Sequence, residues 1–262
     1  MNDLRKIKKK RIDLFPRPLT LIKLESCDST NNFVRCHLSE LIEHFPVGIS
    51  ARTQTKGRGR NNRTWFSFPG KGLYISLGFF ISSPQYLNML SLIAGISISE
   101  TLTLITKRQF TLKWPNDIFY ESQKIAGSLI ENIIKTDRIT SICGIGININ
   151  HNRIDFPEPL KERAVSLKII TGQSLEPHVI EPQLIRTFFK WLGILEKGET
   201  SPIINKARQI NRFQPGEEIV FTQNRKSIKG QFLDINQNGG IEIQLSNGKR
   251  GIYFSGEIDS DL

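Results

Sequence analysis

The stretch KIAGSLIENIIKTDRITSICGIGININ, Lys124–Asn150, carries the strongest indication of the fold. Two apolar runs, 124–135 and 139–150, are separated only by the polar residues Thr-Asp-Arg. Short apolar runs joined by a tight polar turn are typical of a β-hairpin. The stretch therefore predicts two adjacent strands, in which Gly144 and Gly146 permit another segment or a ligand to approach closely.

Strands and helices are expected on both sides of this hairpin. Four further apolar runs, bounded by Gly, Pro or polar residues, predict strands at 18–27, 47–53, 72–80 and 110–114. Helical spacing of apolar residues marks three segments, 28–45, 86–105 and 182–195. The first of these begins with Asp-Ser-Thr, and because Ser and Thr can cap free backbone N–H groups, its start is a possible anion or ligand site.

The residues after Gln214 have a different character. Short β-rich runs alternate there with turn clusters, at 217–222, 229–235, 241–246 and 249–255. This spacing is typical of a small antiparallel barrel. We therefore predict three parts of the chain: a basic N-terminal tail at 1–17, a large domain at 18–213 and a small β-barrel at 214–262.

Composition and charge limit the class of protein. Of 262 residues, 38% are apolar and 23% are charged, which is close to average usage and indicates a globular protein. The net charge of +11 suits a polyanionic partner, but seven Lys/Arg against two Asp at 1–17 contribute +5 of it. The remainder suits a nucleotide as well as a nucleic acid. The apolar runs are too short to span a bilayer, so no membrane segment is expected and a cytoplasmic location is predicted.

The loop TKGRGRNNRTWFS, 55–67, is rich in arginine and glycine. Its glycines let the backbone come close to a ligand, and Arg58 and Arg60 can bind phosphate or carboxylate oxygens through their planar guanidinium groups. A solvated loop or a nucleic-acid patch would have the same composition. Trp65 and Phe66, followed by a buried strand, favour an ordered loop anchored to the core.

A second polar group occurs in KWPNDIFY, 113–120. Trp and Pro end a strand there, so Asn116 and Asp117 are displayed on a rigid turn where they could face a nucleotide or its metal ion, although such turns are common. Lys124 opens the following run and could bring a cation back to the same turn. Asn148, in the glycine-containing strand, is a further potential polar ligand.

Taken in order, the motifs DSTN, TQTKGRGRNNRTWFS, KWPND, KIAGSLIE and GIGININ resemble the motif series of biotin protein ligases. The C-terminal GEI, 256–258, is similar to the end of that family as well. The resemblance covers nearly all of the chain after the basic tail, and its specificity comes from the order of the motifs. A lipoate ligase or lipoyl transferase and a basic nucleic-acid-binding protein are the alternatives, and GRGR together with KWPND favours biotin.

The resemblance implies a fold and a reaction. The fold is α+β, class II synthetase-like, with a mixed, mainly antiparallel sheet flanked by helices and a small SH3-like β-barrel at the C-terminus. The implied enzyme uses ATP, Mg²⁺ and biotin to form biotinyl-5′-AMP and pyrophosphate. It then transfers biotin to a lysine of a biotin carboxyl carrier domain of a biotin-dependent carboxylase.

The resemblance further implies a ligase of the catalytic-only type. About twenty residues precede the first expected strand, too few for the N-terminal DNA-binding domain of some members, so no specific DNA binding is expected. No membrane partner is implied. The family includes both monomers and homodimers, and the sequence leaves that choice open.

Functional residues follow from the resemblance position by position. Biotin contacts are implied for Ser29, Thr30, Asn31, Gln54, Gly57, Arg58, Gly59, Arg60 and Lys124. Contacts with ATP or the adenylate are implied for Arg58, Arg60, Arg63, Trp65, Asn116, Asp117 and Lys124. Lys124 and Arg58 are the implied catalytic residues, and Asn148 is implied near Mg²⁺. Asn62 stands where many members have glycine, and asparagine tolerates left-handed backbone better than most residues.

Overall fold

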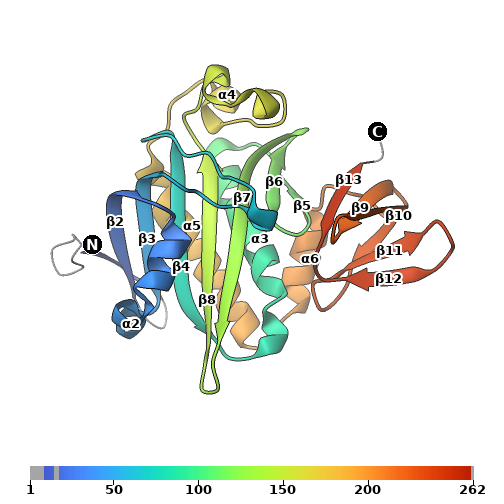
Figure 1. The fold of residues 1–262 in the computed structure, drawn as a ribbon, viewed down its shortest axis with the longest axis horizontal. Helices are drawn as coiled ribbons and strands as arrows, with labels where there is room; N and C mark the ends of the chain where they lie inside the picture. The colour runs from blue at the N-terminus through green and yellow to red at the C-terminus, as the bar shows by residue number, and fades with distance from the viewer. Residues whose placement is uncertain (1–8, 15–17, 261–262) are drawn as a thin grey trace.

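The computed structural model describes residues 9–14 and 18–260. Within these residues the chain forms an eight-stranded sheet with helices on both faces and a five-stranded sheet near the C-terminus (Figure 1). Residues 1–8 and 15–17 of the predicted basic tail lie outside the described residues. Lys9–Ile12, within the same tail, form a strand that was not predicted.

The large sheet has the mixed, mainly antiparallel pairing that was predicted. Its strands are β1 Lys9–Ile12, β2 Leu19–Cys27, β3 Val47–Gln54, β4 Gly72–Ile81, β5 Thr111–Lys113, β6 Asp117–Tyr120, β7 Gln123–Ile134 and β8 Ile139–Asn148. They lie in the order β1-β2-β3-β4-β8-β7-β6-β5, with β2 and β3 parallel and the other neighbours antiparallel. β7 and β8 form the predicted hairpin, in which Ile134 pairs with Ile139 beside the turn.

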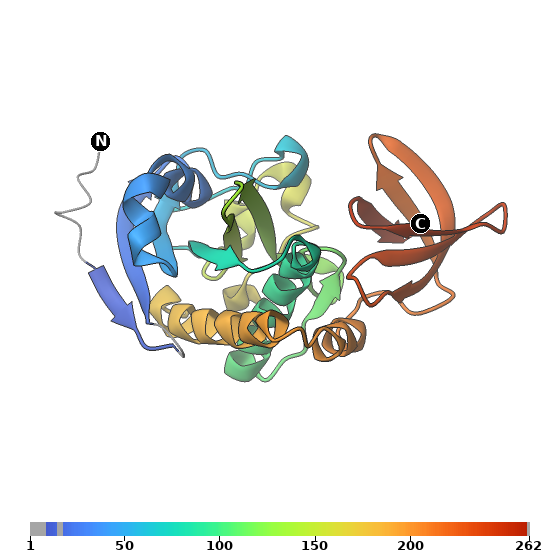
Figure 2. The ribbon, with the colours of Figure 1, turned by 90° about the horizontal axis from the view of Figure 1, so that it is seen from below.

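Helices cover both faces of the sheet (Figure 2). They are α1 Thr30–Cys36, α2 Leu38–Leu41, α3 Met89–Thr106, α4 Leu167–Thr171, α5 Pro177–Glu196 and α6 Ser201–Gln209. Short 3₁₀ turns occupy Ile42–His44, Arg60–Asn62, Pro84–Tyr86, Arg153–Asp155 and Glu158–Leu160. α1 contacts β3, β4 and β8 on one face, whereas α3 and α5 contact each other and the strands on the opposite face.

The alternation of side chains along the strands separates the main core from a second, more polar face. Ile75 of β4 and Ile145 of β8 are buried in the core that contains α3 and α5. Ser76, Gly144 and Gly146 lie at the alternate positions, and they face α1 and the arginine loop. Because successive residues of a strand point to opposite faces, glycines at alternate positions leave one face without side chains while the other face stays apolar.

α3 is the long helix predicted at 86–105, and it begins at Met89 after a 3₁₀ turn. It is long and apolar enough by length and composition to cross a membrane, but two thirds of that segment is buried inside the protein. Its neighbours are α5, α6 and the sheet. A helix that is apolar on nearly all sides is typical of a buried core position, and α3 occupies one.

Two helical predictions differ from the structure. The segment 28–45 is not one helix, because α1 ends at Cys36 and a separate short helix begins at Leu38. Between them, the ring of His37 stacks on Phe33 at 4.3 Å, and its Nδ1 lies 2.9 Å from the Phe33 carbonyl oxygen. The helix predicted at 182–195 begins earlier, at Pro177, and α6 was not predicted.

The C-terminal sheet contains β9 Glu218–Gln223, β10 Lys226–Ile235, β11 Ile241–Leu245, β12 Arg250–Tyr253 and β13 Glu257–Ser260. The strands are antiparallel in the order β12-β11-β10-β9-β13. Trp114 Nε1 donates a 3.1 Å hydrogen bond to the Gly239 carbonyl oxygen, and Arg208 forms a 2.5 Å ion pair with Asp234. These contacts fix the small sheet against β5 and α6.

Candidate active site

Two glycines of β8 form the floor of the candidate site. A Cβ atom on Gly144 would lie 2.3 Å from Asn31 Oδ1, and one on Gly146 would lie 2.4 Å from Trp65 Cε2. Both distances are far below van der Waals contact, so only glycine allows α1 and the loop to approach the strand this closely. The predicted close approach at these glycines is confirmed.

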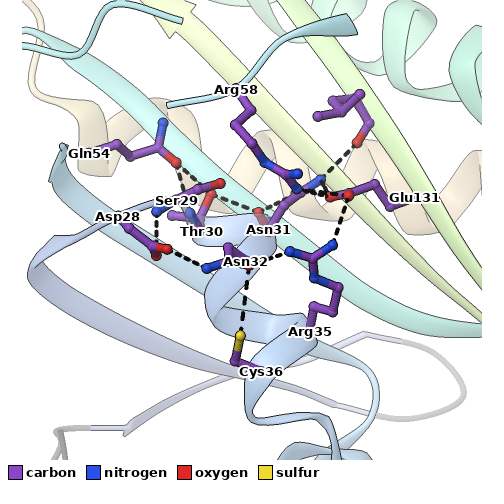
Figure 3. A network of polar contacts seen from close by, with 12 residues as sticks. Asp28, Ser29, Thr30, Asn31, Asn32, Arg35, Cys36, Gln54, Arg58 and Glu131 are labelled. Carbon is purple, nitrogen blue, oxygen red and sulfur yellow. Dashed lines mark hydrogen bonds and ion pairs between the residues drawn. The ribbon is translucent and has the colours of Figure 1, made fainter. Parts of the chain in front are cut away.

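The start of α1 forms a polar cluster with side chains of β3 and β4 (Figure 3). The Thr30 N–H donates a 2.8 Å hydrogen bond to Gln54 Oε1, and Thr30 Oγ1 lies 3.1 Å from the same oxygen. Ser76 Oγ lies 2.7 Å from Thr30 Oγ1 and 2.6 Å from Asn31 Oδ1. Ser29, Thr30 and Asn31 are buried here. The fold brings Thr30, Asn31 and Gln54 together, whereas Arg60 and Lys124, which were also predicted to contact biotin, lie at the KWPND turn.

Ser76 and Glu131 belong to this polar cluster, but sequence reasoning did not select them. Asn31 Nδ2 donates to Glu131 Oε2 at 2.8 Å and to the Leu129 carbonyl oxygen at 3.2 Å. Ser76 is a fully buried polar residue within the apolar strand β4. A hydroxyl at an inward position of such a strand is a signal that could have identified Ser76, because buried polar groups require partners.

The arginine loop is held by hydrogen bonds within its own backbone. Of the two aromatic residues expected to anchor it to the core, Trp65 packs against Gly146, whereas Phe66 is 42% exposed. The Trp65 N–H donates to the Gly57 carbonyl oxygen at 2.9 Å, and the Gly59 N–H donates to the Arg63 carbonyl oxygen at 2.7 Å. A Cβ on Gly57 would lie 2.4 Å from the Trp65 carbonyl oxygen, so this position requires glycine. Asn62 has a φ of 59°, in the left-handed region that asparagine tolerates and glycine favours.

The arginines of the loop point to different parts of the molecule. Arg58 Nη2 donates to both carboxylate oxygens of Glu131 at 2.7 Å. Arg60 Nη1 donates to Asn116 Oδ1 at 2.9 Å, and its Nη2 donates to the Gly256 carbonyl oxygen at 3.1 Å. The loop therefore connects the polar cluster to the KWPND turn and to the C-terminal sheet.

The C-terminal GEI segment contacts the same loop. Glu257 accepts hydrogen bonds from Asn61 Nδ2 at 2.9 Å and Arg63 Nη2 at 2.7 Å. Burial lowers the pKa of Arg60 from its ordinary value, and the carboxylates of Asp117 and Glu257 oppose that effect. The guanidinium retains its proton at neutral pH, because an arginine pKa lies far above that range.

Lys124 lies at the KWPND turn, as its position in the sequence indicated. Its Nζ forms a 2.6 Å ion pair with Asp117 Oδ2 and lies 5.7 Å from the centre of the Trp65 ring. Asn116 Nδ2 donates to the Ser128 carbonyl oxygen at 2.8 Å. A Cβ on Gly127 would lie 2.9 Å from Asp117 Oδ1, so a glycine in β7 makes room for this pair.

Two polar atoms at this end of the site lack partners. Among the described residues, Trp65 Nε1 and Asp117 Oδ1 are buried without a hydrogen bond. An unpaired buried polar atom carries a desolvation cost that a ligand or an ion can relieve. The orphaned atoms lie around the lysine, where the nucleotide was predicted to bind.

Two side-chain oxygens of the site are available to a magnesium ion. The described residues contain no group of three His, Cys, Asp or Glu side chains able to hold a metal by themselves. Mg²⁺ bound with a nucleotide needs only one or two protein oxygens besides phosphate and water. Asp117 Oδ1 is such an oxygen. Asn148 can supply a second one, because its Nδ2 donates to the Val165 carbonyl oxygen at 3.2 Å and leaves its Oδ1 for a ligand.

Fold and site together define a protein ligase of the biotin and lipoate class. The model of the Biotin/lipoate A/B protein ligase family matches residues 24–148. The chain is 30% identical to the bifunctional ligase/repressor BirA of Escherichia coli, over 88% of this chain and 71% of that protein. It therefore belongs to the biotin protein ligase family.

Two further comparisons agree with this family. A solved biotin protein ligase from Aquifex aeolicus, in complex with biotin and ATP, has a TM-score of 0.77 and 32% identity, covering 91% of this chain and 97% of that one. The bifunctional ligase/repressor BirA of Bacillus subtilis is 35% identical over 78% of this chain. The match spans 63% of the length of that relative.

Proposed function

We propose that this protein is an ATP-dependent biotin ligase. It forms biotinyl-5′-AMP and pyrophosphate and then transfers biotin to a lysine of a biotin carboxyl carrier domain. The observation that carries the proposal is that one face of the sheet, left open by Gly144 and Gly146, carries both the polar cluster of Thr30 and Gln54 and the cationic turn of Lys124. The family membership supports biotin as the carboxylic acid substrate that is activated.

The first step joins two anions. A carboxylate oxygen of biotin attacks the α-phosphorus of ATP, the bond to the bridging oxygen of the β-phosphate breaks, and pyrophosphate leaves. Charge repulsion forms a large part of this barrier, so fixed cations lower it by positioning and electrostatic stabilisation. Lys124, already paired with Asp117, is the cation proposed to lie between the carboxylate and the α-phosphate.

The arginines and the aromatic ring complete the proposed nucleotide site. Arg58 and Arg60 are proposed to hold the biotinyl carboxyl and phosphate region, Arg63 to face the triphosphate, and Trp65 to enclose the adenine. Asp117 and Asn148 would hold Mg²⁺, which supplies further charge neutralisation on the phosphates when it is bound. The ordered loop excludes water from the reactive anhydride until the acceptor arrives.

The second step consumes the anhydride. The neutral ε-amine of the acceptor lysine attacks the acyl carbon, AMP leaves with the bonding electron pair, and the amine loses a proton as the amide forms. The proposed acceptor is a carrier domain of a biotin-dependent carboxylase. We also propose that the protein acts in the cytoplasm, without membrane or specific DNA binding.

A two-part assay tests the proposal. The protein is incubated with ATP, Mg²⁺, biotin and a purified carrier domain, and biotin incorporation is measured together with biotin-dependent exchange of pyrophosphate into ATP. Lipoate replaces biotin in a parallel reaction as the test of the related activity. We expect exchange and incorporation with biotin only, and no biotin-dependent exchange in the wild type would refute the function.

A further inference from the structure

Glu131 of β7 connects three separate segments of the chain. Its two carboxylate oxygens accept from Arg58 Nη2 of the loop at 2.7 Å, and its Oε2 also accepts from Asn31 Nδ2 of α1 at 2.8 Å (Figure 3). Arg35 Nη1 lies farther away, at 3.8 Å from Oε1. The Glu131 side chain is 23% exposed, so these contacts are partly shielded from solvent.

A carboxylate suits this position for a chemical reason. Ionised glutamate only accepts hydrogen bonds, so it can serve the Asn31 amide and the Arg58 guanidinium at the same time. The orientation of the Asn31 amide is fixed, because its Nδ2 also donates to the Leu129 carbonyl oxygen and its Oδ1 accepts from Ser76 Oγ. A glutamine in place of Glu131 would keep the shape but turn one acceptor into a donor.

Glu131 also lies at a defined place along the site. It is four residues from Gly127 on the same strand and therefore on the same face, about 13 Å along β7. Gly127 makes room for Lys124 and Asp117, whereas Glu131 belongs to the polar cluster around Asn31. The loop is thus attached at both ends of the site, through Arg58 at one end and Arg60 at the other.

We propose that Glu131 is a positioning residue that orients Arg58 over the biotin end of the site and couples the ordering of the loop to Asn31. The contact uses Nη2 of Arg58, and its Nη1 and Nε hydrogens remain for an anionic substrate. A charged group held in this way loses less conformational freedom when the substrate binds. The expected effect on catalysis rests on the proposed function, but the effect on the loop does not.

The experiment uses four variants. Glu131→Gln, Arg58→Ala and the double variant that combines these two changes are each compared with the control Arg35→Ala. Arg35→Ala is the matched control, because it removes an arginine that faces the same carboxylate beyond hydrogen-bonding distance. Hydrogen exchange of the peptide 55–67 reports loop order without substrate. Pyrophosphate exchange gives the KM for biotin, and the KM for ATP at saturating biotin, for each variant.

Glu131→Gln should accelerate exchange of the loop amides and raise the KM for biotin about tenfold, the scale of one hydrogen bond to a charged group. The KM for ATP should rise less than the KM for biotin, because Arg58 is held at the biotin end of the site, and the melting temperature should stay close to wild type. The double variant should be no worse than Arg58→Ala, since both changes break the same contact, and Arg35→Ala should change the KM for biotin less than about twofold.

Additive effects in the double variant, or wild-type loop exchange in Glu131→Gln, would overturn the proposal. A fall in melting temperature with equal increases in both KM values would overturn it as well, because that pattern indicates a merely structural role. If the wild type shows no pyrophosphate exchange, the proposed function fails, and the loop measurement still decides whether Glu131 holds Arg58.

Discussion

Replacing Gly146 with alanine should displace Trp65 from the sheet. The new Cβ atom would lie 2.4 Å from Trp65 Cε2, 2.6 Å from Cζ2 and 2.7 Å from Nε1. The backbone of Gly146 is held between Tyr74 and Gly127 on the neighbouring strands, so the indole must move instead. Carbon atoms in contact lie about 3.5–4.0 Å apart, which requires a retreat of about 1 Å.

The magnitude follows from this overlap. Overpacking of this kind costs about 1–3 kcal/mol. Trp65 lies in a loop and is partly exposed, so lifting the indole relieves the strain at the expense of its 5.7 Å contact with Lys124. Closing the loop over the nucleotide would return the indole to the crowded position and restore this strain of about 1–3 kcal/mol. The rate of adenylate formation should therefore fall roughly 10- to 100-fold.

The assay is biotin-dependent pyrophosphate exchange, with kcat/KM for ATP as the measured quantity and tryptophan fluorescence as the report on Trp65. Gly193→Ala in α5 is the matched control, because no atom lies within 4 Å of its added Cβ. The control should keep wild-type kinetics and gain about 0.5–1 kcal/mol of stability. Wild-type kinetics and fluorescence in Gly146→Ala would refute the reasoning.

Three more predictions concern charge. Lys124→Gln should lower the rate of pyrophosphate exchange roughly 100- to 1,000-fold, and a rate within twofold of wild type would contradict the role of Lys124. Glu257→Ala should release Asn61 and Arg63 and raise hydrogen exchange in the loop about fivefold, so unchanged protection would argue against the loop contact. Burial lowers the pKa of His151 to about 4, with Asp155 opposing and Lys71 adding to the effect. The unfolded chain therefore binds the extra proton below pH 6.5, and the free energy of unfolding should fall by about 2 kcal/mol from pH 7 to pH 5. In urea titrations, the free energy of unfolding of His151→Phe should depend less on pH than that of the wild type. An equal dependence in both proteins would exclude His151 as the source of the pH effect.

Local patterns predicted most of the regular structure. The hairpin of β7 and β8 was visible because two apolar runs flank three polar residues, and α3 because its apolar residues recur at helical spacing. The same reasoning merged α1 and α2 into one helix, since the stacking of His37 on Phe33 is not encoded in apolar spacing. β1 and α6 were not predicted, because basic or polar residues dominate these short segments.

The sequence by itself determined the order of the motifs, the residues that they contain and the strands and turns that carry them, since these depend on neighbours along the chain. Only the tertiary structure decided which side chains meet. Arg58 and Glu131 are 73 residues apart, and Arg60 and Gly256 are 196 apart. Such contacts depend on the order of strands in the sheet and on the seating of the small C-terminal sheet, and no local pattern records them. For that reason the place of Glu131 in the site became visible only in the folded protein.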